Sequence, residues 1–490
     1  MPETGRTERL LIDGRLVSAS EGGTFDNINP ATTEILGSTA DGTAADMDAA
    51  IAAARRAFDT TTWSTDHAFR VRCLRQLQQA LVKNADRLKA DLVAEIGTPV
   101  ALTSGPQFDT PVEGIGWIAD LAERYAWETD LGEAPGPGGV TSRRWIRREP
   151  IGVVGAITPW NFPTQINLAK VAPALAAGCT VVLKPAPDSP WAATALGRLA
   201  VEETDLPPGV LNIVTSSRHE IGHQLASDPR VDMLSFTGST ATGRAVMTAA
   251  AGNLTKVFLE LGGKSALVAL DDADPATTAV TAAFHITAHA GQGCAILTRL
   301  LVPRALHETF LTALVETLRG WPYGDPTDPA NLMGPLISDR QRRRVLGYIE
   351  RGVAQGARIA LGGRIPDSLP GGWFVEPTVL TDVGENDTVA QEEIFGPVLC
   401  VIPYDGGDDE AVRVANNSAY GLSGAVISAS RDRARAVAAR MRVGTVSVNG
   451  GNYYNFDVPF GGYRQSGIGR ESGVAGFEEY LEIKSMAEGA

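Results

Sequence analysis

Cys294 lies in surroundings that favour chemistry at its thiol. It stands in the segment GQGCA (291–295), where small and polar neighbours let other groups approach the sulfur closely. A cysteine thiolate is a strong nucleophile when its environment favours ionisation. Cys179 and Cys400 lie at or inside apolar strands, and Cys73 adjoins an apolar helix stripe, which is typical of buried structural cysteines. The residue types alone leave Cys294 open between a nucleophile and a structural thiol.

Two further polar residues stand at the ends of expected strands. Glu260 in LELGGK precedes two glycines, at the strand end where α/β folds place their sites. If desolvated there, it has the raised pKa of a useful general base; otherwise it is a surface carboxylate. Asn161 lies in PWNFP (159–163), a turn held by two prolines. Its amide is either a fixed oxyanion donor or a simple turn asparagine.

A glycine-spaced turn, FTGSTATG (236–243), follows another expected strand. It is not GxGxxG, so it indicates a dinucleotide only weakly. Gly238 and Ser239 are placed to offer N–H groups to a phosphate at the start of the next helix. Lys184 ends the strand TVVLK before a proline, which puts an ammonium at a strand's carboxyl edge, where a lone lysine is usually only solvated.

His285 and His289 are four residues apart, a spacing that can chelate a metal or pair a histidine with Cys294. No third ligand and no HExxH pattern accompany them. We therefore interpret both as ordinary histidines of one helix and expect no metal site.

The middle of the chain predicts an α/β fold with a doubly wound parallel sheet. Short apolar strands alternate with helices between Ile151 and Leu261, and a second α/β stretch runs from 265 to 449. Before them we expect a short polar lead and two helices, one capped by Asp46 and one with Val82 in its apolar stripe. The strands are expected at 151–157, 180–184, 210–214, 231–236, 256–261, 265–270, 299–302, 375–380, 398–404, 424–428 and 445–449, and the later helices at 164–176, 190–203 with Ser189 as cap, 219–226, 240–250, 275–290, 306–319, 339–355 and 431–441.

Composition excludes several classes of protein. The 490 residues carry 43 Lys and Arg against 57 Asp and Glu, a net charge of −14 that disfavours a nucleic-acid surface. No apolar run reaches the ~18 residues of a membrane helix, and MPETGRTERL has no signal-peptide core. Four scattered cysteines do not make a disulfide framework. We expect a cytoplasmic enzyme with no membrane association.

Taken together and in this order, the motifs resemble the aldehyde dehydrogenase superfamily. The match covers over 300 residues: PWNFP, KPA, FTGST, LELGGK, GQGC, EEIFGPV and PFGGYRQSGIGRE. The resemblance implies a Rossmann-type cofactor domain (1–127 and 151–261), an α/β catalytic domain (262–465) and a small β oligomerisation arm (128–150 and 466–490). The exposed strands expected near 128–150 and 477–490 fit such an arm, so a homodimer or homotetramer is expected.

The resemblance also assigns roles to residues of this sequence. Cys294 would be the nucleophile, Glu260 the base that activates water, and Asn161 with the Cys294 N–H the oxyanion hole. Lys170 would help to relay protons, and Lys184 and Glu393 would hold the two riboses of NAD. The remaining implied residues are Trp160, Gly238, Ser239, Thr242 and Phe395 for the cofactor, and Phe162, Ile166, Ala169, Tyr454 and Phe460 for the substrate pocket.

The implied reaction is NAD(P)-dependent oxidation of an aldehyde to a carboxylic acid. The thiolate adds to the carbonyl, hydride leaves the thiohemiacetal for the nicotinamide, and water activated by Glu260 hydrolyses the thioester. Relatives that transfer the acyl group to coenzyme A generally lack this glutamate, so a free acid is favoured. The alternatives are a cofactor-independent cysteine esterase or acyl transferase, and a non-catalytic structural relative. Ester turnover without NAD would favour the esterase. Loss of the catalytic residues Cys294, Glu260 and Asn161 would favour the non-catalytic relative.

The sequence departs from the family pattern at a few positions. Pro187 stands where many NAD-preferring members have a glutamate that binds the adenosine ribose, so the resemblance does not decide between NAD and NADP. We favour NAD, because no arginine stands beside Lys184 to bind the 2′-phosphate of NADP. Thr242 replaces a frequent Val or Ile. Ile166 and Ala169 match positions that often carry bulkier side chains. Ala169 would widen the channel, so we expect a bulky or long apolar or aromatic aldehyde.

Overall fold

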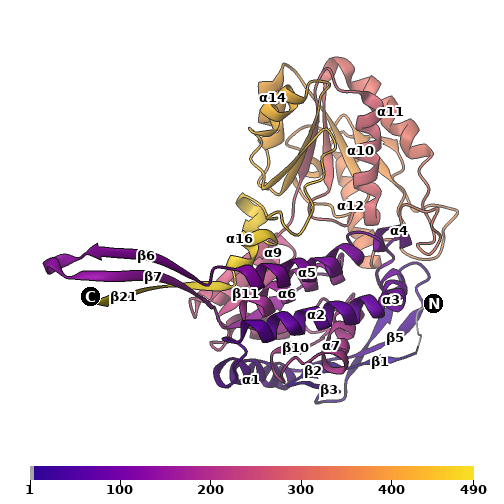
Figure 1. Cartoon of the computed structure of the whole chain (residues 1–490). Coiled ribbons are helices and arrows are strands. Elements are labelled where there is room, and N and C mark those ends of the chain that lie inside the picture. Colours follow the sequence, from indigo (N-terminus) through magenta and orange to yellow (C-terminus); the bar gives the residue numbers. More distant parts are fainter. Residues whose placement is uncertain (1–4, 490) are drawn as a thin grey trace.

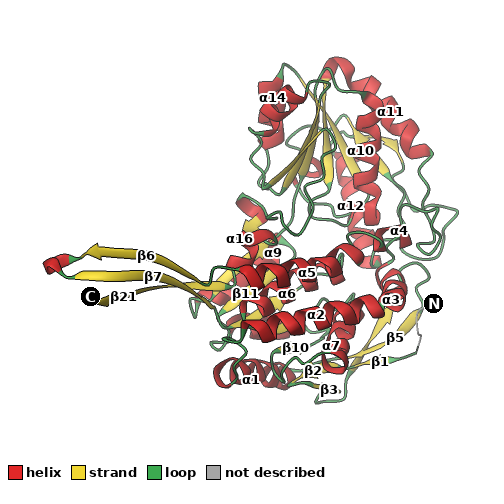
Figure 2. Cartoon of the chain, viewed as in Figure 1, coloured by secondary structure: helices red, strands yellow, loops and turns green. Residues whose placement is uncertain are grey.

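The structure, a computed structural model, describes residues 5–489. Two bodies, each built around one large sheet, lie one above the other in Figure 1, and a β arm projects from the lower body. Helices accompany both sheets (Figure 2), which confirms the predicted α/β class. None of the helices in the described part of the chain has the length and hydropathy of a membrane span.

The sheet of the lower body has eight strands in the order β20-β12-β11-β8-β9-β10-β2-β3. Its five central strands run parallel, as predicted from their apolar runs. The winding reverses between β8 and β11, because β9 and β10 lie on one side of β8 and β11 and β12 on the other. The central strands are β8 (Val153–Ile157), β9 (Thr180–Lys184), β10 (Leu211–Ile213), β11 (Met233–Thr237) and β12 (Lys256–Glu260).

Helices bury both faces of this sheet, and its central strands are accordingly rich in apolar residues. One face packs against α2 (His67–Lys83), α3 (Ala85–Ile96), α5 (Asp109–Arg124), α6 (Pro163–Ala177) and α7 (Trp191–Glu203). The other packs against α1 (Ala44–Thr60), α8 (His219–Ser227) and α9 (Thr240–Ala251).

The first forty residues are not the simple polar lead that we expected. They form β1 to β5, of which β2 and β3 extend the large sheet and the others form a small sheet in the order β1-β5-β4. These strands have two to six residues, too few for a hydrophobic period to show in the sequence. Their bounds, with β20 at the opposite edge, are β1 (Thr7–Glu8), β2 (Leu10–Ile12), β3 (Arg15–Val17), β4 (Thr24–Ile28), β5 (Ile35–Ala40) and β20 (Gly467–Ile468).

The upper body contains a seven-stranded sheet in the order β15-β16-β17-β14-β13-β18-β19, parallel except for β15. Its strands are β13 (Ser265–Ala269), β14 (Leu297–Pro303), β15 (Arg358–Leu361), β16 (Thr378–Thr381), β17 (Val398–Tyr404), β18 (Ser423–Ile427) and β19 (Thr445–Val448). Its helices are α10 (Pro275–Thr287), α11 (His307–Arg319), α12 (Asp339–Ala354), α14 (Asp408–Asn416) and α15 (Arg431–Ala438), of which α14 was not predicted. The short helices of the chain are α4 (Val100–Thr103), α13 (Thr388–Gln391) and α16 (Gly473–Glu478).

The arm consists of β6 (Glu128–Pro135), β7 (Thr141–Pro150) and β21 (Leu481–Gly489). The sequence predicted exposed strands near 128–150 and 477–490, and the two segments lie together here. The first forms a hairpin of β6 and β7, and β21 pairs antiparallel with β7 along the whole length of β21. Figure 1 shows this three-stranded ribbon leaving the body, with the C-terminus beside it.

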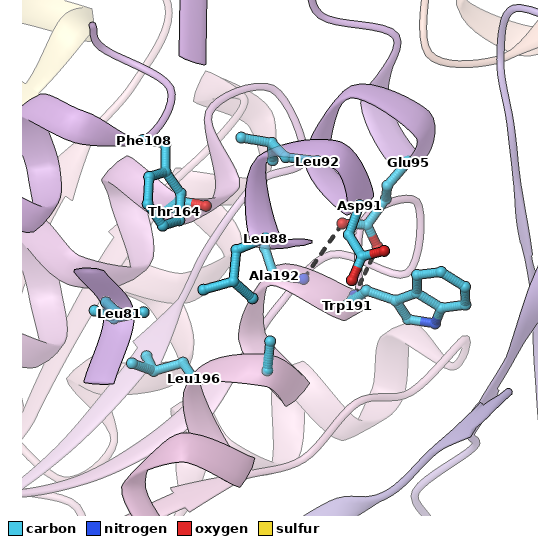
Figure 3. A pocket seen from close by; sticks show the side chains of 11 residues that line it. Leu81, Leu88, Asp91, Leu92, Glu95, Phe108, Thr164, Trp191, Ala192 and Leu196 are labelled. Carbon is cyan, nitrogen blue, oxygen red and sulfur yellow. Dashed lines mark hydrogen bonds between the residues drawn. The ribbon is translucent and has the colours of Figure 1, made fainter. Parts of the chain in front are cut away.

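The start of α7 is capped from another helix rather than by its predicted cap, Ser189. The Ser189 hydroxyl is buried and has no partner among residues 5–489. Glu95 of α3 instead accepts hydrogen bonds from the amides of Trp191 (2.6 Å) and Ala192 (3.3 Å), as Figure 3 shows. A long-range carboxylate takes the place of the local cap, and nothing in the sequence around Ser189 indicates it.

Two details of the first helices also differ from expectation. Thr43, not Asp46, is the N-cap of α1, and Asp46 closes a capping box by accepting from the Thr43 amide at 2.8 Å. In α2, Val82 is exposed although it was placed in the buried stripe. Leu81, next to it, takes the buried position.

Candidate active site

A cleft opens where the winding of the lower sheet reverses, and the upper body closes it. Crevices at such switch points are where open α/β sheets bind ligands. Segments far apart in the sequence meet here: the loop after β8, the loop after β11, the end of β12 and the loop before β14. The cleft residues that the sequence singled out are Trp160, Asn161, Ile166, Gly238, Ser239, Glu260, Cys294, Glu393 and Phe395.

Cys294 is the one partly exposed cysteine; the other three are buried. It follows a short turn (Ala288–Gly291) in which Gly291 has φ 72°, and a Cβ there would lie 2.2 Å from the Gly396 carbonyl oxygen. Only glycine fits that close approach, so the glycine fixes the loop that presents the thiol. Burial and the Glu260 and Glu393 carboxylates raise the pKa of Cys294 well above its usual value.

Glu260 is the last residue of β12 and is 2 % exposed. Burial, followed by the nearby Glu471 carboxylate, raises its pKa well above that of an ordinary glutamate. A hydrogen bond with Cys294 and the Lys170 ammonium act in the opposite direction. Its Oε1 has no partner among residues 5–489. This is a buried carboxyl group with an unpartnered oxygen, in the cleft that Cys294 also lines, as a general base requires.

Asn161 reaches the loop of Cys294. Its side-chain Nδ2 donates to the backbone carbonyl of Gln292 at 2.8 Å, and the backbone carbonyl of Asn161 accepts from Gln107 Nε2 at 3.0 Å. An amide nitrogen has two hydrogens, so one remains for an oxyanion next to the thiol. Gln107 and Gln292, which hold the turn, were not identified from the sequence.

Lys170 lies behind Glu260 and is fully buried. Its ammonium forms an ion pair with Glu471 at 2.8 Å and donates to Ser235 Oγ at 3.2 Å. Glu471 stands in the motif PFGGYRQSGIGRE but was not predicted as a site residue. The structure thus places a second carboxylate, with its own counterion, next to the candidate base.

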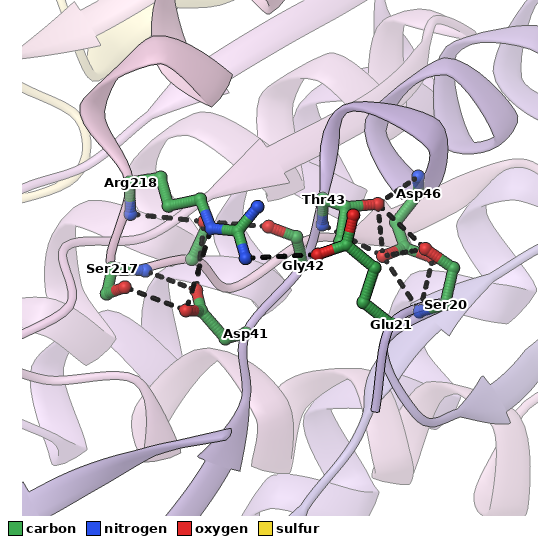
Figure 4. A network of polar contacts seen from close by, with 9 residues as sticks. Ser20, Glu21, Asp41, Gly42, Thr43, Asp46, Ser217 and Arg218 are labelled. Carbon is green, nitrogen blue, oxygen red and sulfur yellow. Dashed lines mark hydrogen bonds and ion pairs between the residues drawn. The ribbon is translucent and has the colours of Figure 1, made fainter. Parts of the chain in front are cut away.

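Lys184, the last residue of β9, is almost completely buried and is not among the residues that line the cleft. Burial lowers its pKa to about 8, and the Asp41 carboxylate opposes that shift. Asp41 is held by Ser216 and Ser217, with Arg218 at 3.9 Å, in the polar network of Figure 4. Lys184 therefore shares its surroundings with a fixed carboxylate that the sequence did not indicate.

Glu393 and Phe395 form the wall that the upper body contributes. Glu393 Oε1 accepts from the Gly263 amide at 2.9 Å, and burial raises the pKa of Glu393 to about 7. Phe395 meets Trp160 edge to face, with ring centroids 5.4 Å apart. Arg344 and Gln341 of α12 bind the backbone carbonyls of this segment, and sequence reasoning missed both.

The loop after β11 supplies a helix N-terminus. Ser239 is the N-cap of α9, and its hydroxyl accepts from the Thr242 amide at 3.2 Å. The first amides of the helix stay available to an anion, as in many phosphate sites. Thr242 itself is exposed on the first turn.

The predicted substrate residues do not all face one space. The ring centroids of Phe162 and His289 lie 5.5 Å apart, and those of Tyr454 and Phe460 lie 6.2 Å apart. Ile166 lines the cleft itself. Ala169 faces a separate apolar cavity lined also by Pro111, Gly114, Trp117 and Phe456.

The histidine pair is not a helix pair. His285 belongs to α10, which ends at Thr287, whereas His289 lies in the following turn with φ 47°. Burial lowers the pKa of His289 to about 3, so it is neutral, and neither ring nitrogen has a partner among the described residues. Within residues 5–489, no group of three His, Cys, Asp or Glu side chains has the arrangement of a metal site.

Comparison with known proteins agrees with this geometry. The model of the aldehyde dehydrogenase family matches residues 16–486. A 3-succinoylsemialdehyde-pyridine dehydrogenase of Pseudomonas sp. is 43% identical over 97% of this chain and 98% of its own length. Among solved structures, a betaine aldehyde dehydrogenase of Staphylococcus aureus with NAD+ has a TM-score of 0.94 at 36% identity, covering 98% of this chain and 94% of that one. A Mycobacterium tuberculosis aldehyde dehydrogenase with NAD+ has a TM-score of 0.93 at 40% identity, covering 99% and 98%. The chain belongs to the aldehyde dehydrogenase family.

Proposed function

We propose that this protein oxidises an aldehyde to a carboxylic acid with NAD+, through a thioester on Cys294. One observation carries the proposal: Cys294 and Glu260 line the same cleft, and Glu260 has an oxygen without a partner among residues 5–489, beside an amide donor from Asn161. Family membership and the NAD+-bound structural relatives support it.

The residues of the cleft fit NAD. The N-terminus of α9 suits a pyrophosphate, and Glu393 in the cleft and Lys184 at the end of β9 have groups that can bind ribose hydroxyls. Trp160 and Phe395 provide an aromatic wall. When bound, NAD+ accepts the hydride that leaves the substrate carbon.

The protein's own groups perform the remaining steps. The Cys294 thiol loses its proton to the solvent of the cleft and its sulfur bonds to the aldehyde carbon. The Asn161 amide and the Cys294 N–H stabilise the oxyanion that forms. After oxidation, Glu260 in its ionised form takes a proton from water, which attacks the thioester and releases the acid and the thiolate. Lys170 and Glu471 lie where that proton can pass on.

The direct test follows NADH and NADPH formation at 340 nm with a panel of aldehydes, with Cys294→Ala beside the wild type. Cofactor reduction that disappears in the variant supports the proposal. Absence of reduction with every aldehyde and both cofactors overturns it. Hydrolysis of nitrophenyl esters without NAD, and without aldehyde oxidation, would instead favour the cysteine esterase.

The substrate that we propose is an apolar or aromatic aldehyde. Ile166 lines the cleft of the thiol, Phe162 contacts the His289 ring in the turn before Cys294, and Tyr454 packs against Phe460. The Pseudomonas relative, by its name, acts on a pyridine-bearing semialdehyde. The kcat/KM should rise from acetaldehyde to arylalkyl aldehydes; a flat or falling series contradicts this assignment.

We further propose a cytoplasmic homodimer or homotetramer, divided into the cofactor domain (1–127 and 151–261), the catalytic domain (262–465) and the arm segments (128–150 and 466–490). The arm supports assembly, because Leu131, Val140 and Ile483 expose apolar side chains on it. Light scattering after gel filtration should give a dimer or tetramer, and Ile483→Asp should weaken it. A monomeric wild type refutes this assembly.

A further inference from the structure

Tyr480 occupies the root of the arm. It is buried immediately before β21, and its carbonyl accepts from the Ile151 amide at 3.0 Å. Ile151 directly follows β7. Tyr480 therefore lies where both long strands of the arm leave the body, and its backbone ties them together.

The Tyr480 hydroxyl points away from the arm, toward the candidate base. It lies 3.2 Å from Ser235 Oγ, which accepts from Lys170 at 3.2 Å, and Lys170 in turn binds Glu471 at 2.8 Å. Ser235 and Lys170 are both fully buried. A chain of polar contacts thus runs from the arm root to the carboxylate pair behind the site.

The register of β11 and β12 places this chain beside Glu260. Ser235 pairs with Phe258 and Thr237 with Glu260, and side chains two residues apart share one face of a sheet. The Lys170 ammonium lies over the Phe258 ring, 4.8 Å from its centroid. Phe258 and Glu260 are two residues apart on β12, which is about 7 Å along a strand, so the Lys170 ammonium lies about that far from the position of Glu260.

We propose that Tyr480 is a positioning residue for water activation: through Ser235 it holds the Lys170 ammonium, and with it Glu471, beside Glu260. A serine hydroxyl has one hydrogen and two lone pairs. Its contact with Tyr480 limits its rotation and leaves a lone pair directed at Lys170. Without that contact, the flexible lysine has one fixed partner fewer, and its charge moves relative to Glu260. This inference rests on the proposed function, in which Glu260 activates water.

The test compares Tyr480→Phe with Tyr404→Phe. The control also removes a buried hydroxyl, which donates to the Ala269 carbonyl at 3.0 Å in the upper sheet. Intact mass spectrometry follows the decay of the acyl group on Cys294 across pH, and the first NADH turnover reports its formation. We expect Tyr480→Phe to form the acyl-enzyme normally but to lose it roughly three- to tenfold more slowly at neutral pH. The midpoint of its pH profile should move upward, because a displaced ammonium favours ionised Glu260 less.

Ser235→Ala should reproduce the effect, and the double variant should show little more than either single one, since both act through Lys170. Tyr404→Phe should leave the decay unchanged. Wild-type decay and pH profile in Tyr480→Phe overturn the inference, as does a fall in melting temperature with no change in the profile. Failure of the wild type to form any acyl-enzyme overturns the proposed function instead.

Discussion

Glu95 and Glu260 are both buried carboxyl groups of the lower body, but their surroundings differ. Burial raises the pKa of Glu95 to about 8 and that of Glu260 well above its ordinary value. Glu95 accepts three hydrogen bonds, from the amides of Trp191 and Ala192 and from Asn27 Nδ2. Glu260 has an oxygen without a partner, directed into a cleft beside a thiol.

The difference shows that burial and a raised pKa do not by themselves mark a catalytic carboxylate. Glu95 is satisfied by donors of its own chain, so its carboxylate fixes a helix start. Glu260 keeps unused hydrogen-bonding capacity, which a folded protein retains where a ligand or water supplies the partner. The two groups should therefore respond to substitution in opposite ways, one in stability and one in rate.

The largest effect is expected for Glu260→Gln. Steady-state aldehyde oxidation should fall roughly 10²- to 10⁴-fold, because an amide cannot take a proton from water. The first turnover of NADH should persist, since Cys294 and Asn161 remain. Stopped-flow absorbance at 340 nm distinguishes the two phases, and thermal unfolding should show no loss of stability. Near-normal steady-state turnover would remove Glu260 from its proposed role.

The reverse is expected for Glu95→Ala. Two helix amides and Asn27 lose their acceptor, so the free energy of unfolding should fall by about 2–4 kcal/mol. Activity per folded molecule should remain near that of the wild type. Urea unfolding measures the loss, and Glu95→Gln, which keeps one acceptor oxygen, should lie between. If Glu95→Ala were stable but inactive, the contrast between the two carboxylates would fail.

Substitution of two charged neighbours of Glu260 should have smaller effects, which shift the pH profile of deacylation in opposite directions. Lys170→Met removes a positive charge that favours ionised Glu260, so the pKa of Glu260 should rise and the deacylation profile should move to higher pH. Glu471→Gln removes a negative charge, so the pKa should fall and the profile should move to lower pH. Decay of the acyl-enzyme between pH 6 and 10 measures both shifts, of about one pH unit each. Shifts of the same sign would contradict the electrostatic account.

Much of the central fold could be predicted, because the parallel strands are continuous apolar runs between helices. β9 was predicted with its observed bounds, and the ends of β8 and β12 differ from expectation by one or two residues. The N-terminal strands could not be predicted because each is too short to show a hydrophobic period. The cap of α7 could not be predicted for a different reason: the acceptor, Glu95, is 96 residues from Trp191 in the sequence.

For the site, local motifs brought Asn161, Glu260 and Cys294 to attention, and the structure gathers them in one cleft. Their partners were not predictable in the same way. Glu471 and Asp41 matter through contacts with residues distant in the sequence. His289 was misread because the helix ends two residues before it, at a turn with positive φ.

The smallest effect concerns the choice between NAD and NADP and involves the surroundings of Lys184 at the end of β9. Asp41 places a fixed negative charge near Lys184, where a 2′-phosphate would add two more, and Pro187 offers no carboxylate of its own. Asp41→Asn keeps the polar shape but removes the repulsion, so kcat/KM with NADP should rise about three- to tenfold relative to NAD. Parallel rate measurements with both cofactors test this, and Glu21→Gln, an exposed neighbour that pairs with Arg218, serves as the control. An unchanged ratio in Asp41→Asn would show that this carboxylate does not face the cofactor's ribose. The selectivity would then have to come from Lys184 and the loop around Pro187.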